Sequence, residues 1–390
     1  MSKINYLFVF LLMVSVACSS GEMAETESSD DSWDTKEMRT QYEDIKVTKL
    51  VDGLERPWAV AFLPDGRKLV TEKPGRLNIV EGNDVTVVDG TPEVSSRGQG
   101  GLLDVVLHPQ YEENGWVYLT FSKPGPDDET ALAVVRGRLD GSSFVDIEEI
   151  FEQNRYSSPG RHYGSKIAFD ANGYMFVSVG DRGADPPRAQ DLSDHAGTLL
   201  RMYDDGSVPD DNPFVNDSNA APEIFSYGHR NIQGLIINHE NNEVWGTEHG
   251  PRGGDELNLI EAGKNYGWPD ASLGRAYGDE TSFHDGTVAR SIDGMEDPVY
   301  EFLPTLAPSG LALVTADNFP NWEGNLLAGG LRAERIRRLL IMDNTVIHDE
   351  ELLLQEVGRI RDVREGPDGN IYVITDEDPG ALYVIEPADL

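Results

Sequence analysis

Two neighbouring stretches of the chain gather side chains that could do chemistry. They are residues 228–235, GHRNIQGL, and residues 248–256, EHGPRGGDE. Together they hold two histidines, two arginines, three carboxylate side chains and five glycines around a short apolar run. Polar groups at this density are costly to keep unless a ligand uses them, and functional residues are often carried by loops. These stretches are therefore predicted to form part of a site.

His162 stands in a glycine-rich loop, GRHYGS, at residues 160–165. The loop has no apolar face that would bury a histidine. Imidazole is the side chain best suited to accept a proton near neutral pH, so His162 is a candidate general base. A solvated or purely structural histidine is the alternative, which the loop by itself leaves open.

Three arginines in the last third of the chain indicate an anion site. Arg359 and Arg361 are two residues apart and would project to the same side of a strand, and Arg332 follows an apolar run. Guanidinium groups held together grip carboxylates or phosphates bidentately. Salt bridges to nearby acidic side chains are the alternative. A formal net charge of −37 makes any cluster of arginines more informative here.

Oxygen ligands are dense between residues 250 and 256. The backbone carbonyls of Gly250 and Pro251 stand near the carboxylates of Asp255 and Glu256, a mixture that suits hard cations such as calcium. A single cysteine excludes a zinc site built from thiolates. The sequence has no phosphate-binding loop, nucleophile elbow or dinucleotide fingerprint in a strand-to-helix context. The chemistry must therefore come from histidine, arginine, calcium and a bound group.

A repeated hairpin must position these residues. Six times, an apolar strand leads into a turn containing Asn, Asp or Glu, usually beside Gly, and a second β-rich run follows at once. The spacing leaves room for two more strands in each unit, which predicts an all-β, six-bladed β-propeller with four-stranded antiparallel blades. A β-sandwich is the alternative, but it would not need the same hairpin six times. The hairpins are predicted at residues 59–71, 103–119, 166–177, 235–245, 311–328 and 361–373.

The propeller geometry predicts which loops meet. The first strand of each blade lines a central channel, so the residues just ahead of that strand gather at one mouth of the channel. Mostly polar and cationic groups would converge there, as expected of a binding pocket. The positions are Arg56, Gln99, His162, Arg230 with Asn231, Ser309 and Arg359.

The amino terminus has the pattern of an exported lipoprotein. Residues 1–17 hold Lys3 and then an apolar run of signal-peptide size, and the order SVAC at residues 15–18 resembles a bacterial lipoprotein cleavage site. Residues 18–44 are predicted as a disordered acidic tether, and residues 45–390 as the catalytic propeller. We expect a periplasmic or surface lipoprotein of the cell envelope, with Cys18 as its only membrane attachment. The strong negative charge excludes nucleic acid as a partner.

With these motifs in place, the chain resembles the bacterial glucose/sorbosone dehydrogenase family, soluble quinoproteins related to the aldose sugar dehydrogenases. The resemblance covers roughly residues 48 to 386. Its most specific markers are GHRNIQGL at 228–235, Gly250-Pro251 with DELNLI at 255–260, and NYGWP at 265–269. It implies a six-bladed propeller that uses pyrroloquinoline quinone (PQQ) and calcium to oxidise aldose sugars at C1 to lactones. The electrons would leave to an unknown acceptor.

The resemblance also implies catalytic and cofactor roles. His162 would remove the proton of the C1 hydroxyl while hydride passes to the C5 carbonyl carbon of the quinone. Arg230 and calcium would polarise that carbonyl. Further cofactor contacts would come from Gln99, Asn231, Arg332, Arg359 and Arg361, the three arginines holding the cofactor carboxylates.

The remaining implied positions surround the metal and the pocket. The backbone oxygens of Gly250 and Pro251 would bind the catalytic calcium, and Asp255 would partner the catalytic histidine or belong to the ligand shell. A second, structural calcium would be bound by Glu256 and the backbone oxygen of Tyr266. Tyr300 and Thr305 would line the pocket.

Three positions depart from the family pattern. Arg161 precedes the base where glucose-active relatives carry Asp, and His249 stands where they carry Gln. Arg332 occupies a position that is often Lys. The substrate preference and the environment of the base are therefore left open by the resemblance.

Two other functions fit a propeller of this size. A calcium-dependent sugar lactonase would use His162 to activate water. In such an enzyme Arg332, Arg359 and Arg361 would have no evident role. A non-catalytic propeller that binds glycans or a partner protein would be expected to lack both the base and the anion grip.

Overall fold

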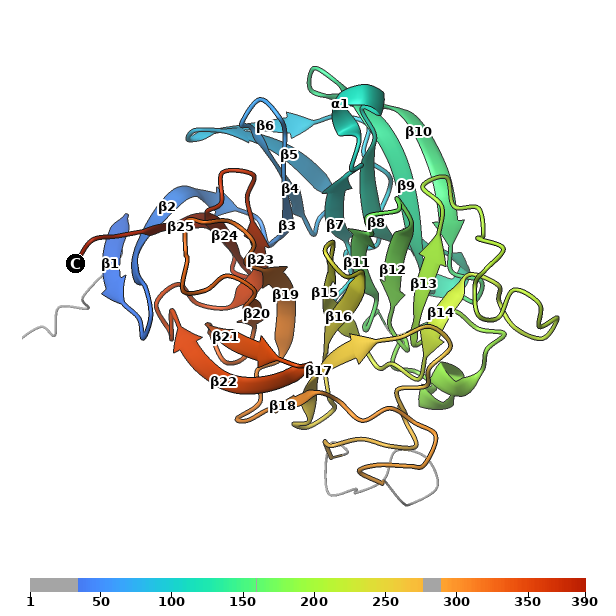
Figure 1. Cartoon of the computed structure of the whole chain (residues 1–390). Coiled ribbons are helices and arrows are strands. Elements are labelled where there is room, and N and C mark those ends of the chain that lie inside the picture. Colours follow the sequence, from blue (N-terminus) through green and yellow to red (C-terminus); the bar gives the residue numbers. More distant parts are fainter. Residues whose placement is uncertain (1–33, 159, 276–288) are drawn as a thin grey trace, which may run out of the picture. The chain divides into compact units, whose positions relative to one another are not determined.

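The computed structural model describes residues 34–158, 160–275 and 289–390. These residues form six antiparallel sheets, five with four strands and one with five (Figure 1). The predicted all-β, six-bladed propeller is confirmed. The predicted signal peptide, Cys18 and the first part of the predicted tether lie outside the described residues and stay predictions.

Each of the first three blades uses four consecutive strands, with the first strand innermost. Blade 1 is β3 (Pro57–Phe62), β4 (Lys68–Glu72), β5 (Arg76–Glu81) and β6 (Asp84–Val88). Blade 2 is β7 (Leu102–Leu107), β8 (Val117–Pro124), β9 (Thr130–Asp140) and β10 (Ser143–Glu152). Blade 3 is β11 (Gly164–Phe169), β12 (Met175–Val179), β13 (Thr198–Met202) and β14 (Ile224–Tyr227).

Blades 4 and 5 repeat this order, and blade 6 completes the ring. Blade 4 is β15 (Ile232–Asn238), β16 (Glu243–Glu248), β17 (Asp255–Ile260) and β18 (Tyr300–Phe302). Blade 5 is β19 (Pro308–Leu313), β20 (Leu326–Gly330), β21 (Arg335–Met342) and β22 (Thr345–Leu352). Blade 6 is β23 (Ile360–Glu365), β24 (Ile371–Thr375), β25 (Gly380–Pro387), β2 (Asp44–Leu54) and β1 (Thr35–Arg39).

Helical structure is scarce in the described residues. It consists of α1 (Tyr111–Asn114) and two 3₁₀ segments, Pro126–Asp128 and Pro186–Gln190. No helix in this part of the chain is long and apolar enough to cross a bilayer.

All six predicted hairpins are present, and each joins the first strand of its blade to the second. The turn before β12 shows why the Asp/Asn–Gly pattern predicts them. Asp170 accepts hydrogen bonds from the backbone N–H groups of Asn172 (2.9 Å) and Tyr174 (2.8 Å), and Gly173 takes a φ of +84°. An acidic side chain that caps the turn and a glycine that tolerates positive φ therefore reverse the chain within a few residues.

The predicted start of the propeller at residue 45 lies too late in the chain. Strand β1 pairs with β2 from Thr35↔Thr48 to Arg39↔Asp44, so the last part of the predicted tether belongs to blade 6. The polar composition of this segment suggested disorder. Its exposed edge position explains the polar side chains, because every second side chain of this outermost strand is exposed and the others are only half-buried.

The inner strands β3, β7, β11, β15, β19 and β23 each contact the next, and β23 contacts β3 (Figure 1). Hydroxyl groups tie several of them together. Thr71 on β4 accepts the N–H of Ala59 (3.1 Å) and donates to the carbonyl of Leu103 in the next blade (2.5 Å). Thr120 and Ser178 repeat this bridge in blades 2 and 3. A small hydroxyl side chain thus joins two blades that share no backbone ladder.

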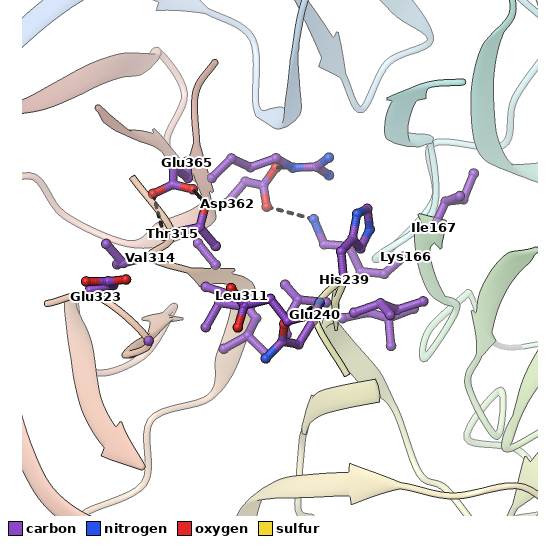
Figure 2. Close-up of a pocket in the computed structure, with 18 residues that line it drawn as sticks. Lys166, Ile167, His239, Glu240, Leu311, Val314, Thr315, Glu323, Asp362 and Glu365 are labelled. Atoms are coloured by element: carbon purple, nitrogen blue, oxygen red, sulfur yellow. Dashed lines mark hydrogen bonds and ion pairs between the residues drawn. The ribbon is translucent and has the colours of Figure 1, made fainter. Parts of the chain in front are cut away.

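Buried ion pairs fill the centre of the ring. Lys166 on β11 bonds Asp362 on β23 (2.7 Å) and lies 3.5 Å from Asp104 on β7, and Arg364 bonds both carboxylates. Figure 2 shows Lys166 and Asp362 reaching toward each other. The cavity around them, about 540 Å³, lies where the inner strands end and includes none of the predicted site residues. The predicted mouth therefore lies at the other end of the inner strands.

We predict that Lys166→Met destabilises the propeller. The substitution leaves two buried carboxylates with only Arg364, and breaking a buried pair by removing one partner costs about 3–5 kcal/mol. Denaturant unfolding followed by tryptophan fluorescence measures the loss. Lys46→Met, which removes an exposed pair with Glu386, is the control and should change stability by at most about 1 kcal/mol. Equal effects of the two substitutions would contradict a stabilising role for the central pairs.

Candidate active site

The predicted mouth residues do converge, because they stand at the starts of strands that form one ring. His162 and Gln99 show this directly. The backbone N–H of His162, just before β11, donates to Oε1 of Gln99, just before β7 (2.7 Å). Asn231, just before β15, accepts the N–H of Gly164 through Oδ1 (3.0 Å). Loops of blades 2, 3 and 4 are thus joined at one end of the propeller.

His162 is held in an unusual conformation by several groups at once. Its φ is +50°, and its carbonyl accepts hydrogen bonds from the backbone N–H (3.3 Å) and the guanidinium (3.2 Å) of Arg182. The imidazole Nδ1 lies 2.7 Å from Oδ1 of Asp181, and Nε2 lies 3.3 Å from Nη2 of Arg230. A non-glycine residue at positive φ persists only where its surroundings impose it, and such residues cluster at functional sites.

The partners of the imidazole define its protonation state. Arg230 has only donors to offer, so the Nε2 atom facing it must be an acceptor, and the proton of the neutral ring lies on Nδ1 toward Asp181. Burial lowers the pKa of His162 below its usual value, and the charges of Arg230 and Arg161 lower it further against the opposing effect of Asp181. At neutral pH the ring is therefore neutral, with its unprotonated Nε2 facing Arg230.

Asp181 is a site residue that the sequence analysis missed. It is fully buried and also accepts the indole N–H of Trp268 (2.7 Å) and the backbone N–H of Gly183 (2.7 Å). Burial acts to raise its pKa, but the hydrogen bond and charge of His162 outweigh it and hold the pKa below its usual value. Asp181 is thus an ionised carboxylate fixed against the imidazole.

A hydrogen-bond network runs from the base to the last blade. Arg230 donates to the carbonyl of His249 (3.2 Å), and Nε2 of His249 lies 3.2 Å from Oε1 of Gln233. The same oxygen accepts from Arg361 (3.2 Å). Burial, with the charge of Arg230 in support, lowers the pKa of His249 to about 3, so this second histidine is neutral as well.

Arg359 and Arg361 pair with the same carboxylate. This agrees with the prediction that residues two apart project to the same side of a strand. They lie 3.0 and 3.1 Å from Oδ2 of Asp376, which follows β24. Lys73, which follows β4, is buried nearby and donates to the carbonyl of Gly98 (2.8 Å). Burial lowers the pKa of Lys73, and the charge of Arg361 adds to that effect while Asp376 opposes it.

Gln233, Lys73 and Asp376 were not predicted, although a signal for the last two was available. The second strand of each blade runs antiparallel to the first, so it ends at the end of the propeller where the first begins. Residues just after the second strands therefore return to the mouth. Lys73, Asp181, His249 and Asp376 all occupy such positions.

Of the two roles expected for Asp255, that of partner to His162 is wrong, because Asp181 takes that place, and that of a member of the ligand shell stays a prediction. Asp255 instead accepts the backbone N–H groups of Gly250 (3.0 Å), Leu306 (2.9 Å) and Ala307 (2.7 Å). It also accepts the hydroxyl of Thr305. Asp255 thereby holds the predicted calcium loop of blade 4 against the loop that leads into blade 5, which also explains the position of Thr305.

Two further predicted residues lie outside this network. Arg332 is exposed, and no hydrogen bond to it is found within the described parts of the chain. Tyr300 contacts Arg337, whose Nη2 lies 2.9 Å from the phenol oxygen. Their assigned roles, as a cofactor contact and a pocket position, stay predictions.

His229 is structural although it belongs to the first motif. It is fully buried between Glu248 at Nδ1 (2.9 Å) and Ser226 at Nε2 (2.9 Å), and it stacks on Tyr266 with ring centroids 4.6 Å apart. Two of the polar side chains in these motifs, His229 and Glu248, therefore pair with each other and need no ligand.

The predicted calcium positions are rich in oxygen. A Cβ at Gly250 would lie 2.1 Å from the carbonyl oxygen of Gly253 and 2.3 Å from that of Gly254, so backbone oxygens crowd this turn. Glu256 and Tyr266 line a small cavity with Glu248, and among the described residues the side chain of Glu256 has one weak hydrogen bond, from Asn258 (3.4 Å). Burial and then the charge of Glu248 raise the pKa of Glu256 well above its usual value.

These features fit the implied cofactor and metal. The Nε atoms of Arg230 and Arg361 are buried and lack a hydrogen-bond partner among the described residues, so both arginines retain donors for an anionic group. A cation beside Glu256 would relieve its repulsion with Glu248. No cluster of three or more His, Cys, Asp or Glu side chains suited to a metal occurs in the described ranges, and the predicted ligands are mainly backbone oxygens.

Comparisons with known proteins agree with the geometry. The chain matches the glucose/sorbosone dehydrogenase family over residues 54–384. It is 41% identical to aldose sugar dehydrogenase YliI of Escherichia coli over 349 residues, covering 88% of this chain and 93% of that protein.

Two solved structures carry the comparison further. The apo form of the soluble E. coli aldose sugar dehydrogenase superposes with a TM-score of 0.85 at 40% identity, covering 88% of this chain and all of that one. The PQQ-bound aldose sugar dehydrogenase of Streptomyces coelicolor gives a TM-score of 0.69 at 26% identity, with coverage of 90% and 99%.

We predict that Asp181→Asn lowers the pKa of His162 further. The amide keeps the shape and one acceptor of the carboxylate but removes the negative charge that favours imidazolium. Histidine NMR titration of the apoprotein measures the shift, and a His162→Gln sample assigns the signal among the eight histidines. Asp185→Asn, an exposed acid on the same loop, is the control and should leave the pKa in place. A rise in the Asp181→Asn protein would contradict the assigned pairing.

Proposed function

Because the chain belongs to the glucose/sorbosone dehydrogenase family, we propose that it is an aldose sugar dehydrogenase that oxidises C1 of the sugar to the lactone with PQQ and calcium. One observation carries this proposal. A neutral histidine, fixed between a buried carboxylate and a guanidinium, faces a mouth whose buried arginines retain unpaired donors. A base and an anion grip at one mouth are the two features that such a reaction requires of the protein.

His162 accepts the proton of the C1 hydroxyl at Nε2. The imidazolium that results is stabilised by Asp181 at Nδ1, 2.7 Å away. Before the reaction, burial lowers the pKa of His162, and the charge of Arg230 adds to this effect, so the resting ring is neutral. The two neighbours thus hold the base ready and then support it once it carries a proton.

The arginines and the calcium loop would hold the cofactor. Bound PQQ supplies the acceptor for the hydride that leaves C1, and calcium supplies a Lewis acid beside it. Arg359, Arg361 and Arg332 would bind carboxylates of the cofactor, and Asp376 fixes the first two in place. The backbone carbonyls of Gly250 and Pro251 would bind the metal, and Asp255 holds their loop.

The two other functions considered from the sequence have less support. A sugar lactonase or a non-catalytic propeller has no use for arginine donors that are buried and unpaired beside a base. A non-catalytic propeller also does not account for Asp181, a buried carboxylate that holds one histidine.

Reconstitution tests the proposal. Purified apoprotein should reduce an artificial electron acceptor in the presence of aldoses only after both PQQ and calcium are added. A chelator that removes the metal should abolish the activity. The expected calcium ligands are mainly uncharged backbone oxygens, so the ion should be removable. Lactone hydrolysis without added PQQ would support the lactonase instead. Failure to oxidise any aldose after PQQ is seen to bind would refute the dehydrogenase.

The role of His162 has its own test. We expect His162→Asn to lower kcat by on the order of 10²–10⁴, the usual contribution of a general base, while PQQ affinity stays close to that of the unaltered protein. Single-turnover reduction of bound PQQ measures the effect. The control is His239→Asn, a histidine at the opposite end of the inner strands, which should turn over normally. Unchanged kcat in His162→Asn would remove it from the reaction.

A further inference from the structure

Arg161 is an exposed cation directly beside the base, and its side chain is held in a defined position. Its Nη2 donates to the carbonyl of Gly183 (2.7 Å). A Cβ at residue 183 would lie 2.3 Å from Nε of Arg161, and Gly183 takes a φ of +66°. Only glycine therefore allows the guanidinium to lie against this loop.

The same short loop holds both the base and the cation. Asp181 binds the imidazole of His162, and Gly183 binds the guanidinium of Arg161. Between them, the buried Arg182 donates to the carbonyls of Arg161 and His162. One short loop thus fixes the positions of both the base and the neighbouring cation.

The charge of Arg161 is not neutralised within the described residues. No carboxylate there lies within ion-pair distance of its guanidinium, and the same holds for Arg182 and Arg230. The nearest acid in the network, Asp181, is already bound to His162 and Trp268. In a protein with a formal net charge of −37, uncompensated cations around a mouth create a local field that attracts anions.

Arg161 is also separate from the predicted cofactor grip. It precedes β11, whereas Arg359 and Arg361 belong to the start of β23. In the ring order β3, β7, β11, β15, β19, β23, these two strands stand opposite each other (Figure 1). Cations therefore lie on two sides of the mouth. The cofactor carboxylates would bind on the side of Arg359 and Arg361, and not on the side of Arg161.

We propose that Arg161 binds an anionic substituent of the sugar, so that the preferred substrates are acidic aldoses, carrying a carboxylate or a phosphate, rather than neutral ones. This inference rests on the proposed dehydrogenase function and specifies its substrate class. Guanidinium groups bind carboxylates and phosphates in the same bidentate manner, so the chemistry is shared by uronic acids and sugar phosphates. A fixed cation beside the base would orient C1 toward His162 by holding the far end of the sugar.

The test compares sugars that differ only in charge. Holoenzyme reconstituted with PQQ and calcium is assayed with D-glucuronate and D-galacturonate, with glucose 6-phosphate, and with glucose and galactose. We expect a higher kcat/KM for at least one acidic class than for its neutral parent, and the two acidic arms show which anion is used. Added salt should reduce this advantage, because it screens the attraction.

The residue is tested by Arg161→Gln. We expect kcat/KM for the acidic sugar to fall roughly 10- to 100-fold, as for a lost hydrogen bond to a charged group. The kcat/KM for the neutral sugar should change much less, because it feels only the lost effect of Arg161 on the pKa of His162, and PQQ affinity should be retained. Arg67→Gln, in the β3–β4 turn at the other end of the propeller, is the matched control and should behave as the unaltered protein. Normal PQQ binding also shows that the altered protein is folded.

The possible failures are distinguishable. If neutral aldoses are oxidised as well as or better than acidic ones, the inference is overturned while the dehydrogenase function stands. If Arg161→Gln weakens PQQ binding, or lowers turnover of both kinds of sugar equally, the cation serves the cofactor or the fold and the inference also fails. If no aldose of either charge is oxidised, both the inference and the proposed function fall.

Discussion

The pairing of β2 with β25 is the contact on which the site depends. It runs from Ile45↔Pro387 to Leu54↔Gly380 and places the beginning and the end of the described chain in one sheet. Neighbouring blades share no backbone ladder, so a ring of six sheets needs this closure to keep blade 6 beside blade 1. Without it, loops separated by hundreds of residues would have no common mouth.

Side-chain hydrogen bonds and ion pairs add further contacts between the blades. The hydroxyl of Thr71 joins blade 1 to blade 2, and that of Ser178 joins blade 3 to blade 4. At the centre, Lys166 and Asp362 connect two inner strands that stand opposite each other in the ring. Such buried pairs cost free energy to desolvate but fix geometry, because each partner is left uncompensated if the strands shift. These central pairs lie toward the end of the ring away from the predicted mouth.

The mouth carries positively charged side chains, although the protein as a whole is strongly acidic. Asp181 and Arg230 contact the two nitrogens of His162 and act on it in opposite senses, which yields a neutral base with one defined tautomer. Buried arginines with unpaired Nε atoms extend this positive region to the start of blade 6. The cationic mouth thus contrasts with the formal net charge of −37 of the whole chain, which suits the anion binding proposed for it.

The sequence by itself determined the hairpins, the propeller and the residues that enter each inner strand, including His162, Gln99, Arg230 and Arg359. These follow from local rules: turn chemistry, strand periodicity and the identity of the first strand in a blade. The tertiary structure decided the partners. It placed Asp181 rather than Asp255 on His162, and it assigned residues 35–39 to an edge strand. It also brought Lys73 and Asp376 back to the mouth, because antiparallel second strands end there. Partners across blades depend on side-chain distances that no local pattern encodes.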